Sequence, residues 1–289
     1  MSDAKLLLTG ANGRTGRAIL ASLVAKGVPV RAMVRDAGQM ESLRALGAAE
    51  CVLGDMTDKA SLRAAMAGAG KVLHIGPPMH PQELEITTSL IALAKAQGLD
   101  HFIYYSVMHP QRRAIRHHRL KQEAEEVLLE SDLPFTILQP SRYMQHLLPI
   151  WPKLLETGVH AMPFGVDKLF NLVDLLDLAE ACGVVAGSDE HLYATYELAG
   201  PEALSQRDCA AIISEVLGRE IAARAVPFED LAAKAAASGA NPDRVAQMVL
   251  MNQHYDAHGF RGNPTVLRHL LGRPLGTFRD YVGRLAARV

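Results

Sequence analysis

The chain has 289 residues, of which 49% are hydrophobic and 5% aromatic, and its formal net charge is −1 at pH 7. This length suits one large domain or two modest ones, and the composition favours helices packed on a parallel sheet over an all-β sandwich. The near-neutral charge argues against nucleic-acid binding, and no apolar run approaches the roughly 20 residues of a membrane helix.

Three cysteines, Cys51, Cys182 and Cys209, lie far apart and form no CxxC pair. This pattern favours reduced, buried thiols in an intracellular protein. The chain enters an apolar strand at residues 5–9 without a secretory signal. We therefore expect a cytoplasmic protein that contacts neither nucleic acid nor membrane.

The first half of the chain alternates short apolar runs with helical patterns. Strands are expected at residues 6–8, 28–34, 49–53, 71–75, 101–106 and 135–138. Helices are expected between them, at residues 16–26, 39–46, 59–67, 83–97 and 116–131. Strands separated by helices of this length predict βαβ units, and hence an α/β Rossmann-type, doubly wound parallel sheet.

After Pro140 the pattern loosens. Helices are expected at residues 172–185 and 205–217, a strand at 194–198, and further helices from there to the end, with interruptions by glycine and proline. We expect an NAD(P)-binding Rossmann domain over residues 1–150. A smaller, mostly helical substrate domain is expected over 151–289, with segments near 165–200 returning to the sheet.

A glycine-rich loop follows the first strand and opens the first helix. It reads Gly10-Ala11-Asn12-Gly13-Arg14-Thr15-Gly16. The first glycine permits a tight turn, the second lets backbone approach a pyrophosphate, and the third lets helix and strand pack closely. All seven residues are candidate cofactor contacts except Ala11. The alternative is a glycine-rich turn that binds no ligand.

The end of the second strand distinguishes the two pyridine dinucleotides. An arginine there accommodates a ribose 2′-phosphate, whereas an acidic residue binds a free 2′-hydroxyl. The chain reads Arg35-Asp36, and Arg14 adds a second cation nearby in the loop. We therefore expect NADP (as NADPH) rather than NAD, although Asp36 keeps NAD open and Arg35 could be a solvated surface residue.

Two further strand ends offer cofactor contacts. Asp55 could accept a hydrogen bond from the adenine amino group while Met56 covers the ring, or Asp55 could instead cap the helix from Lys59. At the end of the fourth strand, Ile75-Gly76-Pro77 lets the chain pass close to the cofactor's ribose and pyrophosphate. The alternative for Gly76 is a simple strand-to-loop turn.

With these motifs and Tyr105-Ser106, the chain resembles the NmrA-like family of atypical short-chain dehydrogenase/reductases over nearly its full length. Further matching stretches are residues 133–140, Val173-Asp174, residues 196–201 and residues 271–274. The family includes quinone and dye reductases, isoflavone-reductase-like enzymes and NADP-sensing regulators. The resemblance implies a Rossmann fold and an NADP site.

The resemblance also implies candidate catalytic residues. Related enzymes use a YxxxK pair, in which the lysine lowers the tyrosine's pKa and holds the nicotinamide ribose. Here Lys121 matches the lysine, but His117 stands in the tyrosine's place. A histidine could supply a proton near neutral pH. The alternatives are a solvated His117 and a surface Lys121.

Two more residues match active-site positions of the family. Ser106, at the end of the fifth strand, could hydrogen-bond a substrate oxygen, or it could cap the turn that follows. Tyr143 corresponds to an aromatic residue near the nicotinamide, and its hydroxyl is an alternative proton donor; it could also be a packing aromatic. His254 and His258 have metal-like spacing but no third ligand, so we expect no metal.

Two functions follow from this pattern. The first is an NADPH-dependent oxidoreductase that transfers hydride to a small, apolar, electron-poor molecule such as a quinone, dye or enone. The second is a non-catalytic NADP sensor acting through a protein partner, which the missing tyrosine favours. An epimerase or isomerase is a weaker third option. The sequence leaves a homodimer open.

Overall fold

The computed structural model describes residues 5–288. Within this range the chain divides into two compact units whose segments interleave. Unit 1 contains residues up to 111, 118–139 and 176–196; unit 2 contains 112–117, 140–175 and 197 onward. The domain boundary near residue 150 stays a prediction, because compactness does not show which segments fold independently.

Unit 1 is built on a seven-stranded sheet with the order β10-β6-β5-β4-β1-β2-β3. The strands are β1 (Lys5–Leu8), β2 (Val30–Val34), β3 (Glu50–Leu53), β4 (Ala69–His74), β5 (His101–Tyr105), β6 (Phe135–Pro140) and β10 (Ala194–Leu198). Strands β1 to β6 pair in parallel. The strand order reverses at β1, which lies between β2 and β4, and ligands of such sheets bind beside the carboxyl ends of the strands at this point.

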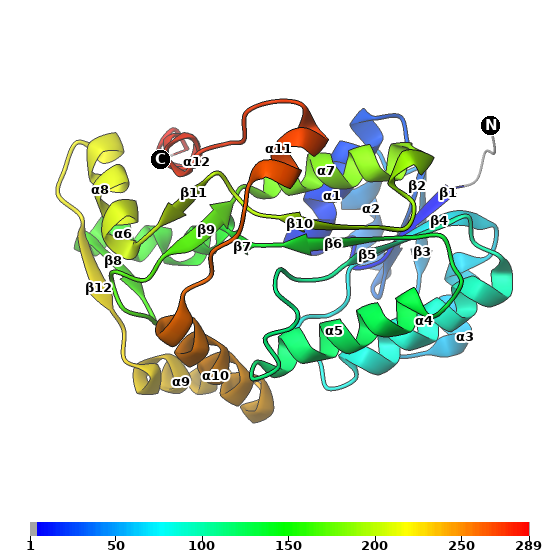
Figure 1. The fold of residues 1–289 in the computed structure, drawn as a ribbon, viewed down its shortest axis with the longest axis horizontal. Coiled ribbons are helices and arrows are strands. Elements are labelled where there is room, and N and C mark those ends of the chain that lie inside the picture. Colours follow the sequence, from blue (N-terminus) through cyan, green and yellow to red (C-terminus); the bar gives the residue numbers. More distant parts are fainter. Residues whose placement is uncertain (1–4, 289) are drawn as a thin grey trace. The chain divides into compact units, whose positions relative to one another are not determined.

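Helices cover both faces of this sheet (Figure 1). They are α1 (Arg14–Ala25), α2 (Met40–Ala45), α3 (Lys59–Met66), α4 (Glu83–Gln97), α5 (Arg116–Leu129) and α7 (Leu175–Gly187), with short 3₁₀ turns η1 (Ala37–Gln39) and η3 (Asp189–His191). Helices α3, α4 and α5 lie on one face and α1 and α7 on the other. This is the Rossmann-type arrangement that the sequence predicts.

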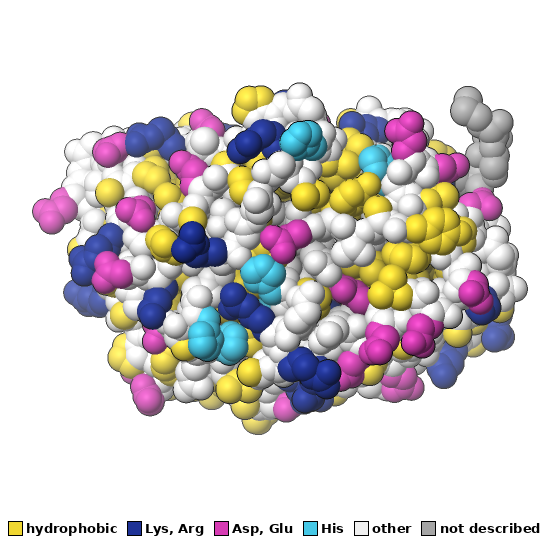
Figure 2. Space-filling model, viewed as in Figure 1, with side chains coloured by type: hydrophobic (Ala, Val, Ile, Leu, Met, Phe, Trp, Pro, Cys, Tyr) yellow, Lys and Arg dark blue, Asp and Glu magenta, His cyan; other side chains and the backbone are white. Residues whose placement is uncertain are grey.

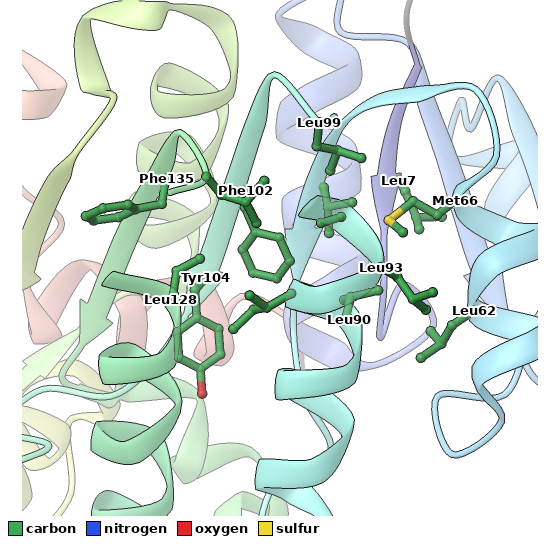
Figure 3. Close-up of a cluster of buried hydrophobic side chains, with 14 of the residues drawn as sticks. Leu7, Leu62, Met66, Leu90, Leu93, Leu99, Phe102, Tyr104, Leu128 and Phe135 are labelled. Carbon is green, nitrogen blue, oxygen red and sulfur yellow. The ribbon is translucent and has the colours of Figure 1, made fainter. Parts of the chain in front are cut away.

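One cluster of buried hydrophobic side chains in unit 1 lies between the sheet and helices α3, α4 and α5 (Figure 3). Helix α4 shows why its sequence folds this way. Ile86, Leu90 and Leu93 recur every three or four residues and are buried, and the helix ends at Gly98, whose φ of 63° suits glycine. Each fully buried leucine stabilises the fold by about 2 kcal/mol relative to exposure.

Unit 2 contains two small sheets that the sequence did not predict. Strands β7 (Arg142–Tyr143), β9 (Phe170–Val173) and β11 (Glu202–Leu204) form one, and β8 (Val159–Met162) pairs in parallel with β12 (Ala222–Ala225). The helix expected from residue 172 was wrong at its start, because Leu172 and Val173 belong to β9 and α7 begins at Leu175.

The helices of unit 2 confirm a largely helical C-terminal part. They are α6 (Trp151–Thr157), α8 (Gln206–Leu217), α9 (Phe228–Ala237), α10 (Pro242–His258), α11 (Thr265–Leu271) and α12 (Phe278–Ala286), with a 3₁₀ segment η2 (Met144–Ile150).

Only glycine fits at position 200, because a Cβ there would lie 1.7 Å from the Leu172 carbonyl oxygen. Asn171 holds this close approach by donating a hydrogen bond to the Gly200 carbonyl at 2.9 Å.

Surface charge is mixed. On the face drawn in Figure 2, lysine and arginine side chains are interspersed with aspartate and glutamate. Among the helices of residues 5–288, none combines the length and the apolar character that crossing a membrane would require.

Candidate functional site

The three loop glycines occupy different environments. Gly10 has a φ of 63°, and a Cβ there would lie 2.9 Å from the carbonyl oxygen of Ile75. A Cβ on Gly16 would lie 2.2 Å from the Gly10 carbonyl oxygen, so no side chain fits. A Cβ on Gly13 would meet only the Gly10 oxygen, at 3.4 Å. Gly10 and Gly16 therefore determine the shape of the loop. Gly13 does not, and its missing side chain leaves open space outside the loop.

The loop leads into the N-terminus of α1, which no side chain caps. Gly13 is the N-cap residue, no side chain caps the helix, and the first turn contains no acidic residue. Asn12 does not cap it either, since its Oδ1 accepts a hydrogen bond from Arg17 at 3.1 Å. The first amides, from Arg14 and Thr15 onward, together with the positive end of the helix dipole, suit a pyrophosphate.

The two residues after β2 differ in what holds them. The Asp36 carboxylate accepts a hydrogen bond from the Gly38 amide at 2.8 Å and caps η1. Arg35 is exposed and makes no hydrogen bond or ion pair with a residue in the described range. The carboxylate that would bind a free 2′-hydroxyl is thus committed locally, whereas the guanidinium that would bind a 2′-phosphate is available.

The residues after β3 form a hydrogen-bonded turn. Asp55 Oδ1 accepts from both the amide and the hydroxyl of Thr57, each at 2.8 Å, and these bonds lower the carboxyl pKa. Asp58 caps α3, so the alternative in which Asp55 caps that helix was wrong. Asp55 is exposed and Met56 half-buried, and their contacts with adenine remain a proposal.

A buried polar pair ties the ends of β1 and β4 together. The Thr9 hydroxyl lies 2.9 Å from His74 Nδ1 and accepts a hydrogen bond from the Ile75 amide at 3.0 Å. His74 Nε2 lies 3.1 Å from the Thr87 hydroxyl. These bonds fix the chain that leads into Gly76 and Pro77, and they hold the Ile75 carbonyl against Gly10.

Lys121 is buried rather than on the surface, so that alternative was wrong. It is 6% exposed, and its Nζ donates a hydrogen bond to the Tyr105 carbonyl at 3.2 Å. Glu83, 1% exposed at the start of α4, forms an ion pair with it at 3.3 Å. Nζ also lies 5.0 Å from the centre of the Tyr104 ring.

These neighbours keep Lys121 charged. Burial alone would lower the pKa of Lys121, but Tyr104 and Glu83 outweigh it and raise the pKa above its usual value. Figure 3 shows the Tyr104 hydroxyl pointing away from the aliphatic cluster. Lys121 is thus a fixed cation at the carboxyl end of β5. His117 precedes it by one helical turn on α5 and is half-buried, and its role stays a prediction.

Ser106 belongs to a buried polar group that the sequence did not reveal. Its hydroxyl donates a hydrogen bond to Glu125 on α5, and Gln139 Nε2 donates to both oxygens of that carboxylate, at 3.0 and 2.9 Å. Burial raises the pKa of Glu125. The Ser106 hydroxyl is therefore oriented toward α5, and its oxygen can still accept a hydrogen bond.

Tyr143 lies in unit 2, on the wall of a partly open cavity. Its ring stacks on His146, with 5.5 Å between ring centres. Phe164, Phe170 and Met162 contribute apolar surface to the same cavity.

The rings of His254 and His258 lie close together but tilted, with 4.5 Å between their centres and 52° between their planes. Within the described range no group of three or more metal-binding side chains occurs.

The partners that orient the candidate residues were not evident from the sequence. Glu83 reads as an ordinary acidic residue in a first helical turn, and only its burial shows that it opposes Lys121. Thr9 directly follows the apolar strand β1 and His74 ends β4, and their pairing depends on β1 and β4 being neighbours in the sheet. A polar residue inside an apolar strand is the one sequence signal that could have identified them.

Comparison with known proteins identifies relatives over nearly the whole chain. The model of the NmrA-like family matches residues 2–264. An NAD(P)H azoreductase of Xenophilus azovorans is 29% identical, covering 98% of each chain. The structure of an NADPH-dependent quinone oxidoreductase from Escherichia coli in complex with NADPH is 26% identical, with a TM-score of 0.85 over 97% of this chain and 99% of that one.

A Citrobacter triphenylmethane reductase in complex with NADP(H) has the same fold. Its TM-score is 0.86 over 98% of this chain and all of that one, at 22% identity. These comparisons confirm the family and the Rossmann-type fold predicted from the sequence.

Proposed function

Because the chain belongs to the NmrA-like family, we propose that it is an NADPH-dependent oxidoreductase that transfers hydride to a small, apolar, electron-poor substrate. Quinones and azo dyes are the first candidates, as the names of the quinone oxidoreductase and the azoreductase suggest. The observation that carries the proposal is the N-terminus of α1, which no side chain caps. Beside it, Gly13 has no side chain and leaves space for a ligand next to the loop.

The loop residues hold the cofactor's phosphates. Amides from Arg14 to Gly16 donate to the pyrophosphate, while Arg35, aided by Arg14, binds the 2′-phosphate. Ile75, Gly76 and Pro77 line the ribose, and Asp55 and Met56 contact adenine. Asp36 supports NADP over NAD, because its carboxylate already caps η1.

NADPH, once bound, supplies the hydride. Lys121 provides a fixed positive charge near the nicotinamide ribose, held by Glu83 and the Tyr105 carbonyl. Ser106 can hydrogen-bond a substrate oxygen once its hydroxyl turns from Glu125 toward the substrate. Tyr143 and His117 are the candidate proton donors, and of these Tyr143 lines the cavity that we assign to the substrate.

The proposal is tested by NADPH oxidation with purified protein against a panel of quinones, azo dyes and enones, without oxygen. We expect turnover of at least one electron-poor acceptor, and slower turnover with NADH. No oxidation of NADPH above the uncatalysed rate with any acceptor would contradict it. We also propose that the protein acts in the cytoplasm, as a monomer or a homodimer.

One observation favours a second function. His117 occupies the place of the proton-donating tyrosine, so the protein could bind NADP and signal its occupancy to a protein partner. The test is the affinity of a captured partner with and without NADPH. Equal affinity in both states would reject the sensor.

A further inference from the structure

The cavity of unit 2 has an unusual cation in its wall. Arg142 lies on β7 with its guanidinium over two aromatic rings, 5.1 Å from the centre of Phe164 and 5.7 Å from that of Phe170. Burial lowers the pKa of Arg142 below its usual value. The side chain is only partly exposed, and its guanidinium lies against an aromatic surface.

Arg142 makes no hydrogen bond or ion pair with any residue of the described range. Other arginines of the chain that are shielded from water do have such partners. Arg31 is bonded to Glu50 at 2.9 Å, and Arg112 donates to the Gly259 carbonyl at 2.7 Å. None of the described residues that line the cavity is acidic. The cavity thus presents five N–H donors without a protein acceptor.

Two other side chains of the cavity are also incompletely hydrogen-bonded. His160 and Gln206 are 6% and 2% exposed, and both line it. His160 Nδ1 and Gln206 Oε1 are buried without a hydrogen-bond partner in the described range. Buried polar atoms are rarely left unsatisfied, since each costs about 1–3 kcal/mol. Both atoms are closed off from the cavity, so a ligand there would meet the Arg142 guanidinium instead.

We propose that Arg142 binds an oxyanion of the substrate, so that the preferred substrate is a conjugated, apolar molecule bearing a carboxylate or phosphate group. The guanidinium binds such a group bidentately, and the aromatic wall holds the apolar body. This inference rests on the proposed function in one respect: the ligand of the cavity is taken to be the molecule that NADPH reduces.

A matched pair of substrates tests the inference. One is a benzoquinone with a propionate side chain and the other is its methyl ester, which leaves the quinone ring unchanged. We expect a KM for the acid at least about tenfold below that for the ester, equivalent to about 1.4 kcal/mol. A third substrate with a phosphate ester in place of the carboxylate shows which oxyanion is preferred. Equal KM values for ester, acid and phosphate would overturn the inference.

Two variants locate the effect. In Arg142→Met the ratio of the two KM values should fall to about one. In Arg224→Met, which removes an exposed arginine from β12 of the same unit, the ratio should be that of the wild type. An acid preference that survives in Arg142→Met would contradict the inference. The wild-type comparison decides the question even if Arg142→Met does not fold.

A binding measurement separates this inference from the proposed function. The propionate compound is titrated into wild type and Arg142→Met in a calorimeter, without NADPH. Binding by the wild type alone, together with no turnover of any quinone, azo dye or enone, would support the oxyanion site and reject the reductase. Turnover of acid and ester with equal KM would support the reductase and reject the oxyanion site.

Discussion

At the scale of single residues, burial decides what the candidate side chains do. Glu83 and Lys121 are both almost fully buried and pair at 3.3 Å. Removing one partner from such a pair leaves an uncompensated charge, whereas replacing both with apolar residues is often tolerated. The pair therefore has a measurable signature in stability.

We predict that Glu83→Leu lowers the free energy of unfolding by about 3–5 kcal/mol. The double variant Glu83→Leu/Lys121→Met should recover much of this loss, because neither charge remains. Urea unfolding of the two variants and Lys121→Met measures the coupling. Additive losses in the double variant would show that the two side chains do not interact energetically.

A second residue-scale prediction concerns cofactor choice. Arg35→Met should weaken NADPH binding by about tenfold or more, because a charge-assisted contact with the 2′-phosphate is lost, and should leave NADH binding unchanged. Fluorescence titration with both coenzymes measures this. Arg63→Met, on exposed α3 surface, is the matched control. Equal weakening of NADPH and NADH binding would mean that Arg35 does not bind the 2′-phosphate.

At the scale of elements, the loop before α1 depends on glycine for its shape. Gly16→Ala should weaken NADPH binding by about tenfold or more, because its Cβ would lie 2.2 Å from the Gly10 oxygen and shift the amides. Gly187→Ala, near the end of α7, meets nothing within 4 Å and should bind as the wild type does. Thermal unfolding of both variants separates a local shift from loss of the fold. Unchanged NADPH affinity in folded Gly16→Ala would argue against phosphate binding at this loop.

The elements of unit 1 were predictable because their signals are local. Helix α4 carries its apolar period and its terminal Gly98 in the sequence itself. Strands β7 and β11 have two and three residues. Such segments are too short to show a period, and they form through partners distant in sequence. The cofactor loop was predictable for the same reason as α4, whereas Arg142 and Glu83 became evident only from burial.

At the scale of the whole molecule, three buried histidines make stability depend on pH. Burial lowers the pKa of His74 to about 3, and those of His101 and His160 to about 4. Since the unfolded chain binds these protons at the ordinary histidine pKa of about 6.5, stability is complete above that pH and is lost as the pH falls toward the folded-state values.

Each of these histidines should cost about 2 kcal/mol of stability at about pH 5 relative to neutral pH. Thermal unfolding across this range measures the loss. His101→Gln should show a shallower dependence on pH, and His269→Gln, at an exposed position, should follow the wild type. An unfolding temperature that does not change between neutral pH and about pH 5 would contradict the burial of neutral imidazoles.

The central claim is that the start of α1 binds the phosphates of NADPH. Calorimetric titration of the purified protein with NADPH and NADH tests it most directly. We predict saturable heat with NADPH and an affinity at least about tenfold higher than for NADH. No heat with either coenzyme at millimolar concentration would contradict the account.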